Sequence, residues 1–373
     1  MRILIYFREL KYAGVHTYLI NHVKYFIKHG HEIWVTFSKD ETRTLFEKLG
    51  AKTFCNKELQ RHICIYKDLI ALWHAYHFCK ANKIECIFSH TSKGGVIGRL
   101  AGFLSGVPKR IHVIHGFSFN KLTPFYKRIP LHFIERIMAY FATALITVNK
   151  SDAELILKSK MCNSNKVHII LNGVKITPKN KLMNEEEKKL FISKNRLNPN
   201  HNIILFVGRL DEDKRPLDLI KAFSMIKKEN IHLAIIGEGN LFSKCSETIL
   251  KMKLSKKVSM LGFRRDVDNW YQVCSVYILP SIREGLPLTL LEAMSFGACC
   301  IATDIEGSRE CIKNGIDGFL VPPKRPDKLY SVLSQILDNQ EIRKNIGEAA
   351  RLKILKEFTV QRMCRETYKV LTN

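Results

Sequence analysis

Residues 276–294 read VYILPSIREGLPLTLLEAM, and this stretch decides the expected fold. The apolar run 276–279 predicts a buried strand, and the segment from Pro287 onward predicts a helix. Gly285 lets the backbone come close to a ligand, and Pro287 suits a first helical turn, where its missing N–H costs nothing. A buried strand that leads through a glycine turn into a helix is typical of a parallel sheet, and the free amides of that helix start favour an anion.

The same alternation of strand and helix extends over most of the chain. Strands are expected at 2–7, 31–37, 84–90, 110–115, 144–149, 166–171, 203–207, 232–236, 258–261, 276–280 and 299–303. Residues 175–198 are polar and lysine-rich, and they predict a linker or the entry to a second domain. We therefore expect an α/β protein with two Rossmann-like, doubly wound domains, 1–180 and 181–355, and the ligand between them.

Composition excludes several classes of protein. The 373 residues are 46% hydrophobic and 25% charged, which is ordinary for globular chains and excludes disorder. The eleven cysteines contain no CxxC pair, so a zinc ribbon is not expected. Their odd number and scattered positions favour a reducing, cytoplasmic location. No signal peptide and no membrane-spanning helix are expected, because the apolar runs are too short.

The net charge of +25, from 60 Lys and Arg against 35 Asp and Glu, is unusual. Residues 86–134 contain no acid. This acid-free stretch carries seven cations, namely Lys93, Arg99, Lys109, Arg110, Lys121, Lys127 and Arg128. A basic face implies nucleic acid, a phospholipid surface or a phosphorylated substrate, whereas the alternative is an ordinary solvated face. No nucleic-acid recognition motif is present, so no specific nucleic-acid partner is expected.

Two segments of the second half carry the candidate chemistry. Glu284 lies in the glycine turn and Glu292 lies eight residues later, inside the following helix, so the two carboxylates suit hydroxyl groups on both sides of a phosphate. The alternative is a capped helix with two solvated glutamates. After strand 203–207, Arg209 and Lys214 can converge on a diphosphate. The alternative there is a solvated turn in which these cations pair with neighbouring acids.

Those neighbouring acids, Asp211 and Asp213, also match a DxD metal pattern. We give this pattern little weight, because basic groups surround the acids and acidic runs are common at helix starts.

The first half offers two weaker candidates. Gly14 joins the first strand to the first helix, where backbone amides can face a ligand. His115 follows strand 110–115 at the edge where open sheets form their sites, and Gly116 comes directly after it. Each has a structural alternative, a helix-start turn for the glycine and packing for the histidine.

Together these residues resemble the GT-B glycosyltransferases of family 4, a retaining group, over nearly the whole chain. The segments that carry the resemblance are Gly14, His115-Gly116, Asn172-Gly173-Val174, Gly208-Arg209 with Lys214, Gly262, and Glu284 through Glu292. The Glu-x7-Glu spacing is the most specific of them. The resemblance implies two domains that face a central cleft, with a final helix over 356–373 that packs back onto the first.

The resemblance also implies a role for each candidate residue. Glu284 would hold hydroxyls of the donor sugar and His115 would contact the transferring sugar. The donor diphosphate would be bound by Arg209, Lys214, Gly14 and the amides of Leu286 to Leu288. Glu292 would accept hydrogen bonds from the ribose, and the backbone at Gly262 and Phe263 would meet the base. No metal or other cofactor is implied, because the two cations and the helix amides stabilise the departing diphosphate.

The expected activity is therefore transfer of a sugar from a nucleotide-diphospho-sugar, with UDP favoured, to a glycan acceptor in cell-surface polysaccharide synthesis. The acid-free stretch, with nearby Phe117, Phe119, Leu122, Phe125 and Tyr126, suits a polyprenyl-diphosphate-linked acceptor at the cytoplasmic face of an anionic membrane. Two alternatives remain open, a nucleotide-sugar epimerase of the same fold and a basic nucleic-acid-binding protein without activity.

Overall fold

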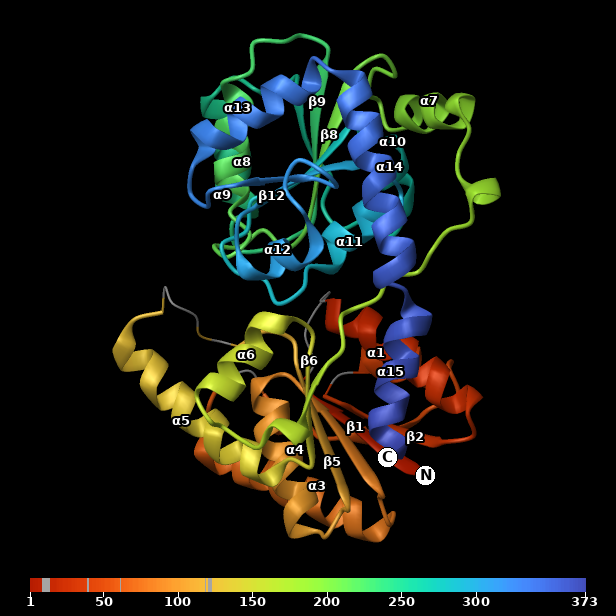
Figure 1. Ribbon diagram of the computed structural model, residues 1–373, viewed down its shortest axis with the longest axis vertical. Coiled ribbons are helices and arrows are strands. Elements are labelled where there is room, and N and C mark those ends of the chain that lie inside the picture. The colour runs from red at the N-terminus through yellow and green to blue at the C-terminus, as the bar shows by residue number, and fades with distance from the viewer. Residues whose placement is uncertain (9–13, 39, 61, 118, 120–122) are drawn as a thin grey trace. The chain divides into compact units, whose positions relative to one another are not determined.

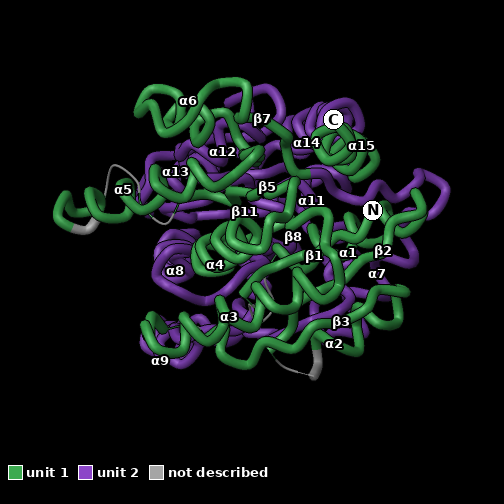
Figure 2. Tube along the Cα trace, turned by 90° about the horizontal axis from the view of Figure 1, so that it is seen from below, with its two compact units in different colours: residues 1–172, 360–373 green, residues 173–359 purple. Residues whose placement is uncertain are grey.

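The computed structural model describes residues 1–8, 14–38, 40–60, 62–117, 119 and 123–373, without the side chains of Asp40, Glu41 and Lys127. The chain divides into two compact units, shown in different colours in Figure 2. The first unit is Met1–Asn172 together with Val360–Asn373, and the second is Gly173–Thr359. The boundaries expected from the sequence were 180/181 and 355/356, and the chain changes unit at 172/173 and 359/360 instead.

The first unit is built on a seven-stranded parallel sheet with the order β3-β2-β1-β4-β5-β6-β7 (Figure 1). The strands are β1 (Arg2–Phe7), β2 (Glu32–Phe37), β3 (Lys52–Cys55), β4 (Cys86–His90), β5 (Lys109–Ile114), β6 (Ala144–Thr147) and β7 (Val167–Ile169). The helices are α1 (Gly14–Lys28), α2 (Asp40–Glu47), α3 (Ile65–Ala81), α4 (Ser92–Leu104), α5 (Phe125–Phe141), α6 (Lys150–Lys158) and α15 (Val360–Thr372). The central strands β1 and β4 are almost wholly buried, as their continuous apolar runs predict for a parallel sheet covered on both faces.

The second unit repeats this plan with a six-stranded parallel sheet, ordered β10-β9-β8-β11-β12-β13. Its strands are β8 (Asn202–Val207), β9 (Ile231–Ile236), β10 (Val258–Met260), β11 (Val276–Leu279), β12 (Cys299–Thr303) and β13 (Phe319–Val321). Its helices are α7 (Glu185–Lys194), α8 (Pro216–Ser224), α9 (Phe242–Lys251), α10 (Val267–Val273), α11 (Leu288–Ser295), α12 (Glu306–Cys311), α13 (Pro326–Leu337) and α14 (Gln340–Glu357).

The strand order places a topological switch point in each sheet. The order reverses between β1 and β4 in the first unit and between β8 and β11 in the second. Loops that leave the carboxyl ends of the two strands at such a point diverge, and open α/β sheets bind their ligands in the space between them. The segments that follow β8 and β11 are those that the sequence singled out, 208–216 and 280–288.

The polar segment 175–198 contains α7 and lies in the second unit, so of the two possibilities that the sequence left open it is the entry to a second domain. The side chain of Asn184 accepts a hydrogen bond from the backbone of Glu187, and the Glu187 side chain accepts one from the backbone of Asn184. This capping box satisfies two backbone donors at the helix start. The Asn-x-x-Glu pattern at 184–187 was the available signal, and the lysine-rich composition concealed it.

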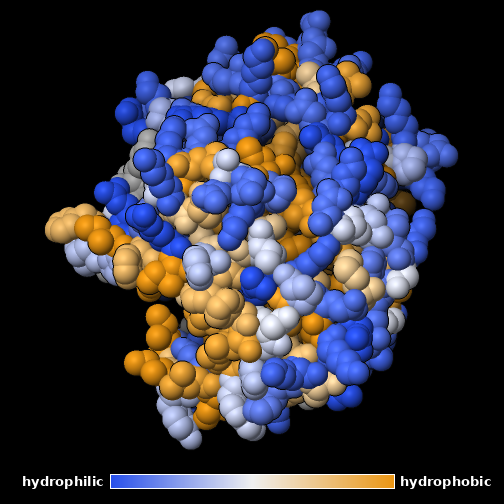
Figure 3. Space-filling model, turned by 60° about the horizontal axis from the view of Figure 1, so that its bottom comes forward, coloured by the Kyte–Doolittle hydropathy of each residue, from blue (hydrophilic) through white to orange (hydrophobic). Residues whose placement is uncertain are grey.

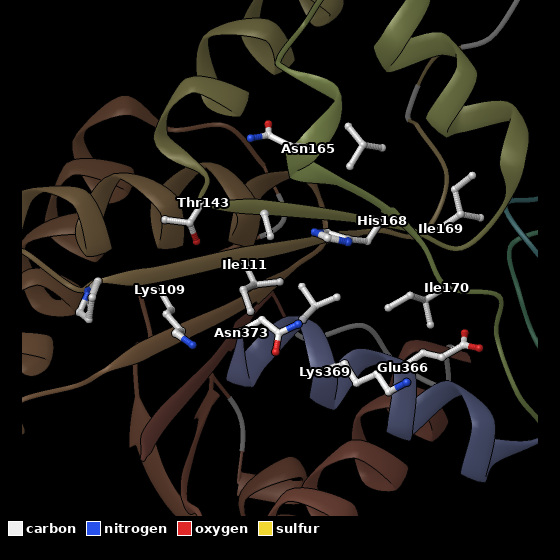
Figure 4. Close-up of a pocket in the computed structure, with 14 residues that line it drawn as sticks. Lys109, Ile111, Thr143, Asn165, His168, Ile169, Ile170, Glu366, Lys369 and Asn373 are labelled. Atoms are coloured by element: carbon white, nitrogen blue, oxygen red, sulfur yellow. The ribbon is translucent and has the colours of Figure 1, made fainter.

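The last helix, α15, belongs to the first unit and lies beside α1 (Figure 1). The Nε2 atom of His22 on α1 is 3.1 Å from the hydroxyl of Thr367 on α15, and both side chains are fully buried. Figure 4 shows Glu366 and Lys369 of α15 and His168 of β7 on opposite sides of a hollow of 870 Å³. None of the residues that the sequence proposed for the site lines this hollow.

Candidate functional site

Lys214 and Glu284 form an ion pair at the switch point of the second sheet. The Lys214 Nζ atom lies 2.5 Å from Glu284 Oε1, although 70 residues separate them, and their side chains are 16% and 11% exposed. Lys214 follows β8 and Glu284 follows β11, which are neighbouring strands. The ammonium has three donors and the carboxylate two acceptor oxygens, so the pair leaves hydrogen-bonding capacity on both sides for a ligand.

The two loops that carry this pair are fastened to each other. The backbone N–H of Ile282 donates to the carbonyl of Asp213 at 2.8 Å, and Arg283 pairs with the carboxylate of Asp213 at 2.6 Å. Because these bonds lie beside the Lys214–Glu284 contact, the positions of the two functional side chains are set by backbone as well as by charge.

Arg209 lies on the same loop and reaches toward solvent. Its guanidinium is 3.1 Å from the carboxylate of Asp211, and the side chain is 54% exposed. Asp211 also accepts the backbone N–H of Lys214 at 3.1 Å. Arg209 therefore pairs with Asp211 as the structural alternative predicted, whereas Asp213 pairs with Arg283 and Lys214 pairs with Glu284. Among the described residues, no three His, Cys, Asp or Glu side chains are grouped so that they could share a metal ion.

Arg215 covers the start of α8. It adopts the left-handed region with φ of 53° and forms two hydrogen bonds to Asp218, at 2.8 and 2.9 Å. A glycine would adopt this backbone conformation without strain, so the arginine side chain compensates by bonding within the first turn of α8.

Glu292 lies on α11, the helix that follows the turn with Glu284. Its Oε2 accepts a hydrogen bond from the phenol of Tyr271 at 3.0 Å, and burial raises the pKa of Glu292 to about 7. Burial also raises the pKa of Tyr277 on β11, and the charges of both Glu284 and Glu292 add to that rise. The Tyr277 hydroxyl also donates to the Thr289 hydroxyl on α11 at 2.9 Å.

The turn before α11 packs closely against α12. Leu286 is buried, and Leu288 is the first residue of α11, where amides have no partner within the helix. A Cβ atom at Gly307 of α12 would lie 2.6 Å from the carbonyl oxygen of Gly285. A side chain at position 307 would therefore displace the turn that holds Glu284.

Gly262 and Phe263, proposed for the base, follow β10 at the same edge of the sheet. The carbonyl of Gly262 accepts the N–H of Gly237 at 2.8 Å, and Phe263 is 42% exposed. A Cβ at Gly237 would lie 1.9 Å from the carbonyl oxygen of Gly208, so only glycine fits between these two loops. The turn 237–240 is thus a packing element beside the site.

In the first unit, His115 lies directly after β5 in a group of aromatic rings. Its Nε2 is 3.1 Å from Nδ1 of His90, the last residue of β4, and the two ring centroids are 5.3 Å apart. Tyr18 of α1 meets the His115 ring edge-on at 4.8 Å. Burial, with a smaller contribution from His22, lowers the pKa of His115 to about 3, so the imidazole is neutral at physiological pH.

Gly14 is the first residue of α1 and is exposed, and the neighbouring Ala13 lies outside the described residues. Gly14 and His115 belong to the first unit, whereas the other site residues belong to the second. Their roles toward a donor remain predictions.

The sequence did not point to His90, Tyr18 or the Asp213–Arg283 pair. His90 ends an apolar run, as His115 does, and this was an available signal. Its contact with His115 depends on the pairing of β4 with β5, which cannot be read from the order of residues along the chain.

The described cations of the acid-free stretch do not form one basic face. Lys93 pairs with Asp68 at 2.5 Å, Arg99 is buried against Glu135 at 3.1 Å, and Lys109 donates to the carbonyl of Leu371. Arg110 donates to the carbonyl of Phe141 at 2.7 Å. Arg128 is exposed, Lys121 lies outside the described residues, and so does the side chain of Lys127.

Exposed apolar groups, by contrast, are concentrated on α5. Six of them share one face of this helix at 100° per residue. They are Phe125, Tyr126, Ile129, Phe133, Ile137 and Tyr140, which we call the α5 stripe. Figure 3 shows apolar surface on the left of the molecule, the side on which α5 lies in Figure 1. Phe117 and Phe119, which the sequence grouped with them, belong to the core instead.

Comparison with known proteins identifies the family. The model of Glycosyltransferase Family 4 matches residues 12–177, and that of Glycosyl transferases group 1 matches residues 187–353. An Escherichia coli UDP-Gal:alpha-D-GlcNAc-diphosphoundecaprenol alpha-1,3-galactosyltransferase is 31% identical over 320 residues, which cover 83% of this chain and 81% of the relative. The chain is a family 4 glycosyltransferase.

Further relatives of this glycosyltransferase agree with that assignment. The Staphylococcus aureus capsular polysaccharide biosynthesis glycosyltransferase CapM is 26% identical over 313 residues, which cover 81% of this chain and 80% of CapM. The structure of Anabaena HepE in complex with UDP and glucose superposes with a TM-score of 0.85 at 18% identity, over 100% of this chain and 99% of HepE. The expected GT-B fold, with two Rossmann-like units, is confirmed.

The glycosyltransferase has no helix, within the described residues, that is both long and apolar enough to span a membrane.

Proposed function

We propose that this glycosyltransferase transfers a sugar from a UDP-sugar to a polyprenyl-diphosphate-linked glycan in the synthesis of a cell-surface polysaccharide, with retention of anomeric configuration. The names of the Escherichia coli relative, with its diphosphoundecaprenol acceptor, and of capsular CapM support this substrate class.

The observation that carries the proposal is the Lys214–Glu284 pair at the switch point of the second sheet. A diphosphate needs cations and amide donors, and a sugar needs hydrogen-bond acceptors for its hydroxyls. The pair presents a cation, Lys214, beside a hydrogen-bond acceptor, Glu284. We assign Lys214, Arg209 and the backbone N–H groups of Leu286 and Leu288 to the diphosphate, because charge-assisted bonds to phosphate oxygens are the strong ones.

The remaining groups have matching roles. Glu284 accepts hydrogen bonds from hydroxyls of the transferring sugar, and Glu292 accepts them from the ribose. The backbone at Gly262 and the ring of Phe263 adjoin the base. In the first unit, Gly14 supplies a backbone contact to phosphate and His115 contacts the transferring sugar.

The chemical step depends on stabilising the departing UDP. When the bond between the anomeric carbon and the phosphate oxygen breaks, negative charge grows on the diphosphate, and fixed cations lower the barrier by stabilising that charge. We propose that Lys214 and Arg209 supply this stabilisation without a metal ion. The pairing of Asp211 with Arg209 and of Asp213 with Arg283 supports the proposal, because these acids are already neutralised by arginines.

We propose further that the first unit binds an anionic membrane surface through the α5 stripe. Aromatic and aliphatic side chains on one helix face suit the boundary between headgroups and acyl chains, and the exposed Arg128 and Arg136 on the same helix suit anionic headgroups. Such a position would bring the enzyme to a lipid-linked acceptor.

The proposal is tested by incubating the enzyme with UDP-galactose, UDP-N-acetylgalactosamine and UDP-glucose, with and without a synthetic GlcNAc-diphospholipid. Release of UDP that requires the acceptor, with a mass increase of one sugar in the lipid, supports it. NMR of the new linkage then reports the anomeric configuration. Formation of an epimer without acceptor, or no turnover with any donor, contradicts it.

A further inference from the structure

His90 has an arrangement that the proposed roles do not explain. It is fully buried at the end of β4, and its Nδ1 is the atom that meets Nε2 of His115. Its other ring nitrogen, Nε2, is buried and has no hydrogen-bond partner among the described residues. Burial, together with the neighbouring His115, His112 and His22, lowers the pKa of His90, so its imidazole is neutral and carries a single proton.

The location of that proton follows from the surroundings of the ring. If the proton were on Nε2, a buried N–H would have no acceptor, and such orphaned donors are rare in folded proteins. If it is on Nδ1, the ring donates to His115, and only a lone pair is left without a partner. The second arrangement is the more stable one, so His90 is the donor in the contact between the two histidines.

This assignment fixes the protonation of His115 as well. Its Nε2 must then accept, and a neutral imidazole with a bare Nε2 carries its proton on Nδ1. That Nδ1 has no hydrogen-bond partner among the described residues, and the His115 ring is only half-buried. The ring is contacted on two sides, because His90 lies nearly in its plane at Nε2 and the Tyr18 ring stands almost perpendicular to it.

The backbone beside His90 is also strained. Thr91 has φ of 62° and ψ of 154°, a region that β-branched residues almost never adopt. Its hydroxyl accepts the N–H of Arg8 at 3.2 Å, which ties the end of β4 to the end of β1. Strain of this kind persists only where the surrounding structure enforces it. Here the bond from Arg8 to Thr91 holds the residue next to His90.

We propose that His90 is a positioning residue that holds His115 in its Nδ1–H form, so that His115 donates a hydrogen bond to an oxygen of the bound sugar. In this form His115 offers no lone pair to the substrate, and so it does not remove the proton of the acceptor hydroxyl. The inference rests on the proposed function for the presence of a sugar, but the tautomer itself is a property of the protein alone.

The test is ¹⁵N NMR of the histidine rings in the full chain, combined with kinetics. The two informative variants are His90→Asn, whose amide can still donate from nearly the same position, and His90→Asp, whose carboxylate can only accept. His232→Asn is the matched control, because His232 is a buried histidine with a hydroxyl partner in the other unit.

In the wild type and in His90→Asn, we expect His115 to be protonated on Nδ1 and bare on Nε2. In His90→Asp, we expect the proton of His115 to move to Nε2, where the carboxylate accepts it, and kcat to fall about tenfold, with KM for the donor nearly unchanged, since one hydrogen bond to the transition state is lost. His232→Asn should change neither the tautomer nor kcat.

Three results would overturn the inference. They are an Nε2–H tautomer of His115 in the wild type, a tautomer that does not respond to His90→Asp, or full kcat in His90→Asp. Failure of the proposed function is a separate outcome, because it would appear as absence of transfer by the wild type while the NMR result still decides the tautomer.

Discussion

The carboxyl edges of the two sheets differ in their chemistry although they share one architecture. At β4 and β5 the first unit presents neutral imidazoles, His90 and His115, whose pKa values are lowered by burial. At β8 and β11 the second unit presents the Lys214–Glu284 ion pair. The doubly wound fold supplies a place for a site at each switch point, and the residues that follow the strands decide whether that place suits a neutral or a charged group.

This difference predicts that substitutions in the second unit affect donor binding and leaving-group departure, whereas substitutions at the histidines affect turnover with little effect on nucleotide binding. The predictions below test that division, from the largest expected effect to the smallest.

Replacement of Glu284 has the largest expected effect. Glu284→Ala removes the acceptor for sugar hydroxyls and leaves Lys214 without its partner, so kcat should fall about a thousandfold, a loss typical of removing one group that acts in the transition state. The measurement is steady-state transfer, with circular dichroism to confirm folding. Glu212→Ala, on the exposed part of the neighbouring loop, is the control. Near-normal turnover of Glu284→Ala would remove Glu284 from the site.

The cations should control UDP affinity. Charge-assisted hydrogen bonds contribute about 1.5–3 kcal/mol each, so Arg209→Ala should weaken UDP binding by roughly tenfold to a hundredfold. Lys214→Ala should weaken it as well, with an added loss because Glu284 is left unpaired. Calorimetry with UDP measures both, and Lys257→Ala, which removes a cation paired with Glu229 at the amino end of β10, is the control. Unchanged UDP affinity in both variants would place the diphosphate elsewhere.

His115→Ala should show the opposite pattern. Because the imidazole is neutral, its removal should lower kcat while leaving the UDP dissociation constant within about twofold of the wild-type value, since no charged hydrogen bond to phosphate is lost. Kinetics and calorimetry on the same preparation separate the two quantities. A large loss of UDP affinity with normal kcat would make His115 a nucleotide-binding residue and would erase the difference between the two edges.

Glu292 should make donor binding depend on pH. Its pKa is raised from 4.5 to about 7, and ribose hydroxyls that donate to it stabilise the charged form. UDP binding should therefore release protons near neutral pH, and affinity should be lower at about pH 6 than at about pH 8. Calorimetry in buffers of different ionisation enthalpy measures the release, and Glu292→Gln should abolish it. Proton uptake, or no proton exchange, would contradict the assignment.

The raised pKa of Glu292 also affects stability, but here the effect of rising pH is unfavourable. Between pH 4.5 and about 7 the folded protein holds the Glu292 proton more tightly than the unfolded chain does, so this group lowers the free energy of unfolding as pH rises. Glu292→Gln should remove that part of the pH dependence in denaturant titrations. An unchanged dependence would mean that Glu292 is already ionised in the folded protein.

The smallest expected effect concerns the membrane. Phe133→Ser combined with Tyr140→Ser should reduce flotation with anionic liposomes by several-fold, because apolar area on the α5 stripe is lost, and transfer to a water-soluble acceptor should not change. Leu352→Ser, an equally exposed apolar position in the second unit, is the control. Equal flotation of both variants, or none by the wild type at low salt, would contradict membrane binding through α5.

Much of the fold could be predicted because apolar runs mark buried parallel strands. The runs 2–7 and 203–207 coincide with β1 and β8 to within a residue. The helix α7 was missed because its polar composition resembles a linker, and its stability comes from a capping box rather than from a buried stripe.

The site was predictable residue by residue but not in its pairing. Lys214 and Glu284 were both named from the sequence, but their contact depends on β8 lying beside β11, with β9 and β10 placed on the other side. The basic stretch misled for a related reason. Arg99 counts as a surface charge in the sequence, yet it is buried against Glu135 of α5. The charged residues of a sequence segment do not by themselves show on which face of the fold their side chains lie.

The central claim is that the switch point of the second sheet holds the donor, with Lys214 and Arg209 on the diphosphate, Glu284 on the sugar and Glu292 on the ribose. A crystal structure of the enzyme with UDP bound tests it most directly. We predict phosphate oxygens within hydrogen-bonding distance of Lys214 Nζ and the Arg209 guanidinium, and ribose hydroxyls on Glu292. UDP bound away from the carboxyl ends of β8 and β11, with Lys214 bonded to Glu284 alone, would contradict the account.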